Sequence, residues 1–353
     1  MRHIEIIIPF GLPPAKMAAA LIRELRTPAL ATLVARANAA PRLPEFGPQA
    51  RVLPHGAWLA YQFGLTADFE QNNSPPIATA SMQLLGQTPD HGVWFILNPV
   101  NIQVGANQIL LSDQRHLNLS DKESHLLFEV AKPCFDAANK TLLYGSNTVW
   151  FVRADDWKAL RTSTPDAACG RNLIPWMPQG EMATEWNRLH NEVQMLWHQH
   201  PINAAREQRG LEPVNALWLW GGASGALPTL PAITPYIATY NLSGWISTFG
   251  HFAEENNTNC SAADLIASAP ERSLLLIDNL IAPALARDWP QWLNVFHKLE
   301  KLWFAPLLAA LEEQKIDRLT LHLSHDTSLA SFASDRQTLR KFWLRKSLAR
   351  LKQ

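Results

Sequence analysis

Short apolar runs alternate with polar, helix-forming stretches along most of the chain. The run Ile4 to Ile8, rich in β-branched residues and ended by Pro9, predicts a central strand. Further strands are expected at 93–97, 148–152, 216–220, 236–240, 273–278 and 318–323. The longest expected helices span 15–39, broken near Pro28, and 289–314, bent before Pro306. This alternation predicts an α/β fold with a mostly parallel central sheet flanked by helices.

One segment departs from the alternation and predicts a separate substructure. Two strands, at 93–97 and 148–152, enclose a hairpin-like return at 108–111 and a helix. That helix begins at Ser120-Asp-Lys-Glu123, which matches a capping box. We therefore expect a small α+β insert at 92–155, carried by a main α/β domain made of 1–91 and 156–353.

Amides, imidazoles and glycines gather between Trp186 and Gly222. A helix with one apolar face leads into the buried run 216–220, which we expect to stop at a glycine turn. The polar and glycine positions beside this strand are the ligand-binding candidates, namely His190, Gln194, His198, Asn203, Asn215, Gly221 and Gly222.

Each of these candidates has a functional and a purely structural interpretation. His190, Gln194 and His198 share a helix face, and a His pair at that spacing can bind a metal. The alternative is a hydrogen-bonded helix face. The glycines after the strand can cradle an anion through backbone N–H groups, or form a plain turn.

Composition narrows the class of protein. With 353 residues, 47% of them hydrophobic and 18% charged, the chain can bury a large core. Basic and acidic residues both number 31, so we expect neither a nucleic acid nor a membrane as partner. The three cysteines are far apart, match no zinc spacing and indicate a reducing, cytoplasmic compartment.

The tail 336–352 differs from the rest of the chain in its charge. It carries seven cations and no acid, with Leu339, Phe342 and Trp343 placed to hold one side against the protein. A solvated helix face is one interpretation, and binding of an anionic partner is the other.

Several motifs resemble those of the bacterial Rpf-type regulatory proteins, which are described as phosphoglycerate-mutase-like. The resemblance is carried by Asn191 to Met195, His200 to Asn203 and Pro213 to Gly222. It implies an alkaline-phosphatase-type scaffold, in which a parallel sheet holds two metal ions at its strand ends. Ligands of such sheets lie beyond the carboxyl ends of the strands.

The resemblance also implies where a metal site would lie. Its metal candidates are the polar residues on or after the last two parallel strands, namely Asp278, His322, His325 and Asp326. The alternative is that His322 points into the sheet while His325 and Asp326 form a turn or cap. In the superfamily, the first strand ends in an Asp-Gly pair that binds metal, whereas here it ends Ile8-Pro-Phe-Gly11.

We therefore expect a regulatory or ligand-binding protein without two-metal phosphomutase activity and without a cofactor. Its expected partner is a phosphorylated small molecule or a protein. The alternative is a phosphoglycerate mutase or phosphatase-type enzyme with a rearranged site that holds Mn²⁺ or Mg²⁺.

Overall fold

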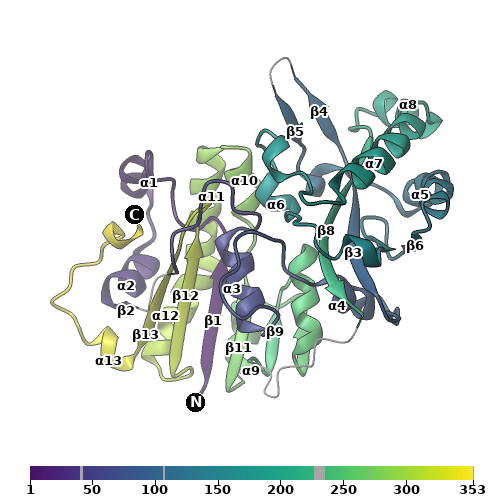
Figure 1. Ribbon diagram of the computed structural model, residues 1–353. Helices are drawn as coiled ribbons and strands as arrows, with labels where there is room; N and C mark the ends of the chain where they lie inside the picture. Colours follow the sequence, from purple (N-terminus) through teal and green to yellow (C-terminus); the bar gives the residue numbers. More distant parts are fainter. Residues whose placement is uncertain (40–42, 106–107, 226–234, 269, 353) are drawn as a thin grey trace. The chain divides into compact units, whose positions relative to one another are not determined.

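The computed structural model describes residues 1–39, 43–105, 108–225, 235–268 and 270–352. The chain divides into two compact units, coloured along the sequence in Figure 1. Unit 1 comprises Met1–Pro48, Pro54–Phe63 and Leu230–Gln353, and unit 2 comprises Gln49–Leu53 and Gly64–Thr229. The expected insert, 92–155, lies inside unit 2, which extends beyond it in both directions.

Unit 1 is built on a central sheet. Within the described residues its seven strands run in the order β10-β9-β11-β1-β12-β13-β2. Their bounds are β1 (His3–Ile8), β2 (Asn38–Ala39), β9 (Ala238–Tyr240), β10 (Glu255–Asn257), β11 (Arg272–Leu276), β12 (Arg318–Ser324) and β13 (Leu329–Asp335). The pairs from β10 to β12 are parallel, and β13 is antiparallel to β12. The expected α/β fold with a mostly parallel sheet is confirmed.

Strand β1 is central because both of its edges and both of its faces are covered. It pairs with β11 on one side and β12 on the other. Its isoleucines Ile4, Ile6, Ile7 and Ile8 are fully buried. A β-branched run of this kind fits a strand that has no solvent-facing side.

Helices cover both faces of this sheet. They are α1 (Ala18–Glu24), α2 (Pro28–Arg36), α3 (Pro54–Gln62), α9 (Ala262–Ser268), α10 (Ile281–Leu285), α11 (Trp289–Leu299), α12 (Ala305–Glu312) and α13 (Arg336–Leu339), with the 3-10 helices η4 (Gly244–Phe252) and η6 (Ala349–Leu351). On one face Trp58 of α3 packs against His322 at a tilt of 37°, with ring centroids 4.3 Å apart. On the other face Ser334 Oγ donates to the Leu33 carbonyl of α2. Because side chains alternate along a strand, these two contacts lie on opposite faces.

The predicted interruptions of the long helices are present. Pro28 begins α2, where its missing N–H costs nothing. The turn η5 (Glu300–Phe304) between α11 and α12 is π-helical, and Pro306 follows it. Proline cannot donate to the carbonyl one turn earlier, which explains why the regular ladder is broken there.

Two expectations for the C-terminal part were wrong. Strand β12 is not the last, because β13 returns antiparallel beside it. The sequence of β13 is rich in alanine and serine, which come in adjacent pairs, and holds no β-branched residue, so its strand signal is weak. The tail is not one helix, since only Arg336–Leu339 is helical before the short η6.

Unit 2 is antiparallel. Within the described residues a four-stranded sheet has the order β6-β7-β3-β8, from β3 (Val93–Val100), β6 (Thr141–Tyr144), β7 (Trp150–Arg153) and β8 (Ala216–Ser224). A hairpin of β4 (Ile102–Val104) and β5 (Ile109–Leu111) accompanies it. The helices are α4 (Ala78–Leu84), α5 (Asp121–Ala137), α6 (Pro165–Ala168), α7 (Ala183–His198) and α8 (Pro201–Gln208), with short 3-10 turns η1 (Gln114–His116), η2 (Asp155–Trp157) and η3 (Ile174–Trp176).

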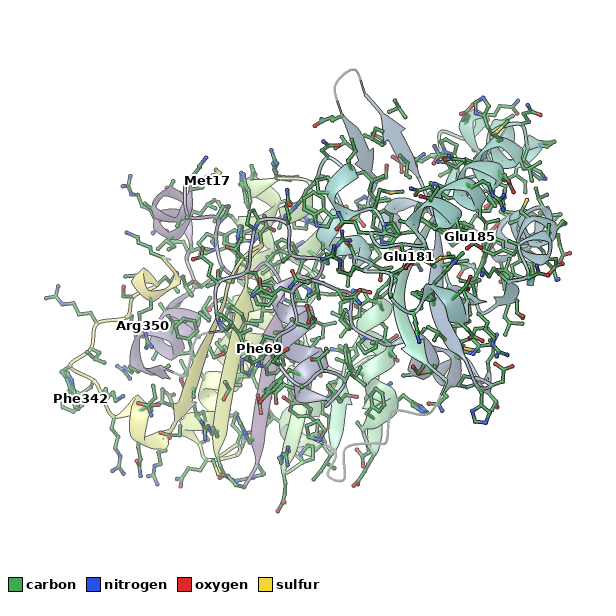
Figure 2. All side chains as sticks on the ribbon, viewed as in Figure 1. Met17, Phe69, Glu181, Glu185, Phe342 and Arg350 are labelled. Carbon is green, nitrogen blue, oxygen red and sulfur yellow. The ribbon has the colours of Figure 1, made fainter. Side chains whose placement is uncertain are left out.

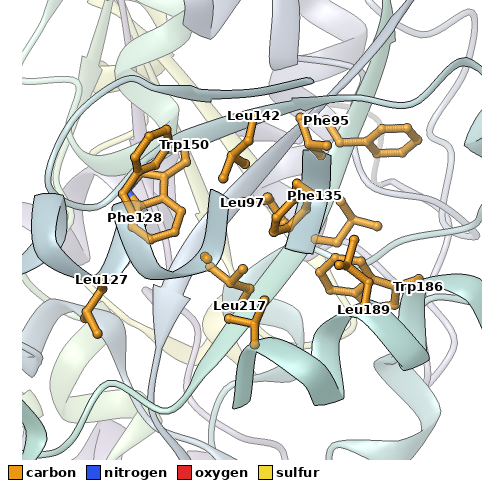
Figure 3. Packing of buried hydrophobic residues seen from close by; sticks show 14 of the residues in the cluster. Phe95, Leu97, Leu127, Phe128, Phe135, Leu142, Trp150, Trp186, Leu189 and Leu217 are labelled. Atoms are coloured by element: carbon orange, nitrogen blue, oxygen red, sulfur yellow. The ribbon is translucent and has the colours of Figure 1, made fainter. Parts of the chain in front are cut away.

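The core of unit 2 is aromatic. Figure 3 shows Trp150, Phe135 and Trp186 packed among leucines from the sheet and from α5 and α7. The predicted capping box at Ser120 and Glu123 is present at the start of α5. Among the described residues, no helix is both long and apolar enough to cross a lipid bilayer.

Strand β8 does not end at its glycines, contrary to the expected turn. It continues to Ser224 through a β-bulge, where the pairing with β3 shifts between Trp94 and Ile96. Gly221 has a φ of 73°, which strongly favours glycine. The bulge therefore explains Gly221.

The face of α7 that carries His190, Gln194 and His198 changes from buried to exposed along the helix. His190 is buried and packs against Trp186, with ring centroids 5.4 Å apart. Burial lowers the pKa of His190 to about 4. Gln194 is half-buried and His198 is exposed. The shared face that the spacing predicts is therefore not one continuous exposed surface.

The buried Glu300 links the π-helical turn to the start of α2. Its carboxylate accepts from Ala29 N at 2.6 Å and from Leu30 N at 3.2 Å. We expect Glu300→Ala to lower the free energy of unfolding by about 3 kcal/mol, because two helix N-terminal donors lose their acceptor. Urea unfolding measures this, with the exposed Glu312→Ala as control. Equal loss in both variants would contradict the capping role.

A second prediction concerns His190. As pH falls from about 6.5 to about 4, the unfolded chain takes up a proton while buried His190 stays neutral. The native state should therefore lose about 3 kcal/mol over this window, and the loss should level off below the folded pKa. We expect His190→Leu to lack this component in urea unfolding measured across the same pH range. The exposed His198→Leu on the same helix is the control, and an identical pH profile for both variants would refute the prediction.

Candidate functional site

The carboxyl edge of the parallel strands in unit 1 is the candidate site. Strands β11, β1 and β12 are neighbours, and their ends lead to Asp278, Phe10 and His325 respectively. Ligands of open α/β sheets bind at this edge, because loops from several strands meet there. Figure 1 shows these three strands side by side.

Phe10 occupies the end of the central strand. Its side chain is 4% exposed, and its φ of 56° is uncommon for a bulky residue. The backbone is fixed by Trp292, whose Nε1 donates to the Phe10 carbonyl at 2.9 Å. The ring centroid lies 6.3 Å from that of His55 and 6.3 Å from that of His325. An aromatic ring therefore stands beside two imidazoles, where the resemblance implies a carboxylate.

His55 and Ser324 are buried beside Phe10. His55 Nδ1 lies 3.2 Å from Ser324 Oγ, and both side chains are buried. Ser324 Oγ also accepts from Phe10 N at 3.4 Å. Sequence reasoning missed His55, although a histidine at the start of a short helix that follows a loop was a signal.

The metal candidates near this edge have protein partners. The Asp278 carboxylate accepts from the Ser243 hydroxyl, which comes from the loop after β9. His325 N donates to Ser328 O at 2.8 Å, so His325 and Asp326 lie in the turn between β12 and β13. Both are half-buried.

His322 belongs to a different cluster. Its Nδ1 lies 2.7 Å from Ser331 Oγ, and its Nε2 lies 2.9 Å from Glu5 Oε2. Trp58 covers the imidazole. Within the ranges that the structure describes, no three His, Cys, Asp or Glu residues form a group able to hold a metal. The four candidates Asp278, His322, His325 and Asp326 therefore do not make up one metal site.

Glu5 is an ionisable residue of β1 that the sequence analysis did not include among the candidates. Burial alone would raise its pKa, but the His322 hydrogen bond and the nearby imidazoles hold the pKa of this carboxyl below its usual value. The signal was an acid inside the run Ile4 to Ile8, since a carboxylate in a central strand requires a partner.

The two asparagine candidates lie in unit 2 and bond to its backbone. Asn203 Nδ2 donates to Trp197 O and Val214 O, and its Oδ1 accepts from Val214 N. Asn215 exchanges two hydrogen bonds with the backbone of Ile102. These amides tie helices and loops to the sheet.

The glycines of β8 are also engaged within unit 2. Gly221 N donates to Ser74 Oγ at 2.8 Å. A Cβ on Gly222 would come within 2.4 Å of the Phe95 ring. Close packing explains Gly222, and the Gly221 amide binds a side chain of this chain.

Comparisons with known proteins agree with the scaffold. No protein-family model matches the chain. Three curated relatives are each named 2,3-bisphosphoglycerate-independent phosphoglycerate mutase. The relative from Methanosarcina barkeri is 24% identical over 171 residues, 48% of this chain and 40% of the relative. The relative from Methanosarcina mazei is 22% identical over 228 residues, which make up 64% of this chain and 54% of the relative. The relative from Methanothrix thermoacetophila is 31% identical over 67 residues, which make up 19% of this chain and 17% of the relative.

These first two matches span about half the length of the curated relatives. Among solved structures, the PH0037 protein from Pyrococcus horikoshii has a TM-score of 0.54 at 12% identity, covering 94% of this chain and 87% of that one. The cofactor-independent phosphoglycerate mutase from Thermoplasma acidophilum has a TM-score of 0.48 at 13% identity, covering 99% and 94%. None of the curated relatives bears an Rpf-type name, so these relatives support only the phosphoglycerate-mutase part of the resemblance. On the sequence matches, this chain is a distant homologue of the cofactor-independent phosphoglycerate mutases.

Proposed function

We propose that this chain is a ligand-binding or regulatory protein on a phosphoglycerate-mutase-like scaffold, without two-metal phosphoryl transfer. The observation that carries the proposal is the Phe10 ring at the carboxyl end of the central strand. A strand end in this position is where such a scaffold would present a metal ligand.

The residues at this edge do not fit a pair of divalent cations. Such a pair needs carboxylates and imidazoles that converge from several strand ends. Phe10 supplies no donor atom, and its ring packs beside His55 and His325. The Asp278 carboxylate is already bonded to Ser243.

The proposed ligand is a phosphorylated small molecule, with a protein partner as the second candidate. Support comes from the kinds of group at the edge, since the imidazole of His325 is suited to phosphate oxygens. The curated relatives are named for phosphoglycerate. Cys134, Cys169 and Cys260 are free thiols, in keeping with the cytoplasm as proposed compartment.

Metal analysis with activity assays tests the proposal directly. We expect purified protein incubated with Mn²⁺ or Mg²⁺ to retain no stoichiometric metal and to show no mutase or phosphatase turnover. Addition of 3-phosphoglycerate should still raise the melting temperature, because a ligand that binds only the native state stabilises it. Stoichiometric metal, with turnover that is lost in Asp278→Ala, would instead establish the enzyme with a rearranged site.

Substitution of Phe10 tests its role at the strand end. Phe10→Asp places a carboxylate beside two imidazoles, so we expect Mn²⁺ to raise the melting temperature of this variant but not that of the wild type. Without metal, loss of the buried ring should lower the free energy of unfolding by about 3 kcal/mol.

Phe10→Asn is the matched control, because asparagine has nearly the shape of aspartate and also tolerates a positive φ. It should lose stability without responding to Mn²⁺. Equal stabilisation of the wild type by Mn²⁺ would show that Phe10 does not prevent metal binding.

A further inference from the structure

Three large apolar side chains stand exposed in one short segment of unit 1. Phe342 is 80% exposed, Trp343 68% and Leu344 38%. The two rings meet edge to face, with centroids 5.4 Å apart. Phe342 is labelled at the outer margin of unit 1 in Figure 2. We refer to residues 340–346 as the basic–aromatic loop.

Cations flank the apolar residues on both sides. Arg340 and Lys341 precede them, and Arg345 and Lys346 follow. Among the described residues, the side chains of Arg340, Arg345 and Lys346 form no ion pair. The chain as a whole is neutral, with 31 basic and 31 acidic residues, yet the tail 336–352 contains no acid. The tail is therefore strongly positive, although the net charge of the whole chain is zero.

The loop is held at both ends by the body of unit 1. On its N-terminal side, Lys341 Nζ donates to Asn38 Oδ1 at 2.8 Å. On its C-terminal side, Arg350 donates to the Val34 and Ala37 carbonyls, both at 2.7 Å. Leu348 and Leu351 are buried. The loop is thus a fixed projection that presents its apolar residues outward.

We propose that the basic–aromatic loop binds an anionic phospholipid surface. Phe342 and Trp343 enter the headgroup layer, where aromatic side chains are favoured, and the flanking cations contact lipid phosphates and carboxylates. The expectation of no membrane partner rested on the zero net charge, which does not describe this surface. The proposal concerns peripheral binding and is independent of the proposed function at the sheet edge.

Two other anionic partners fit the loop less well. Single-stranded nucleic acid uses aromatic faces to stack successive bases, whereas here the two rings pack against each other and Leu344 has no face to offer. An acidic peptide needs a concave receptor to bury its side chains, whereas these residues project.

Cosedimentation of the full chain with vesicles tests the proposal. We expect binding to equimolar phosphatidylserine and phosphatidylcholine, and little binding to phosphatidylcholine alone. Arg345→Gln with Lys346→Gln should weaken partitioning about 25-fold, since each cation near an anionic surface contributes about fivefold. Phe342→Ser with Trp343→Ser should weaken it about tenfold or more.

The control is Lys301→Gln with Leu302→Ser, which removes an exposed cation and a 62% exposed leucine elsewhere on the same unit. It should bind vesicles like the wild type, and thermal melting checks that every variant is folded. Three results would overturn the proposal: no preference for phosphatidylserine, equal loss in the control, or wild-type binding by the Phe342/Trp343 variant. Binding to single-stranded poly(U) RNA without vesicle binding would also overturn it, in favour of a nucleic acid.

Discussion

Parallel pairing of β1 with β11 and β12 is the constraint on which unit 1 depends. The register sets Ile6 between Leu275 and Leu321, so the three strands run in step and end at one edge. Residues as distant in sequence as Phe10 and His325 are brought into ring contact by this pairing. The isoleucines of β1 are buried on both faces of the sheet, which stabilises this pairing.

The same constraint decides what the sheet edge can bind. An aromatic ring at the end of β1 contributes packing and no charge beside the imidazoles of His55 and His325. Polar side chains are found instead on the sheet face. There His322 is hydrogen-bonded to Glu5 and Ser331, and Trp58 covers its imidazole. A half-buried carboxylate with such partners stays charged without a large desolvation penalty. Polar groups thus stabilise the sheet face, while the position expected for a metal ligand at the end of β1 is apolar.

Unit 2 shows why polar residues beside a buried strand are ambiguous in a sequence. Asn203 and Asn215 bond to backbone groups that the antiparallel sheet leaves unpaired, and Gly221 permits a bulge. Buried polar groups need partners whether or not a ligand exists, so the residue types are the same for both roles. The density of amides there predicts hydrogen bonding, but the partners that the structure gives to these amides belong to the chain itself.

The sequence alone determined the α/β class, the central position of β1, the breaks at Pro28 and before Pro306, and the capping box of α5. These features depend on local rules, namely side-chain periodicity, the missing N–H of proline and a cap four residues long. The tertiary structure alone decided that β13 returns beside β12, that β8 continues through its glycines, and that His322 faces Glu5 instead of Asp278. Those outcomes depend on which strands become neighbours, and pairing between segments hundreds of residues apart leaves no local trace in either segment.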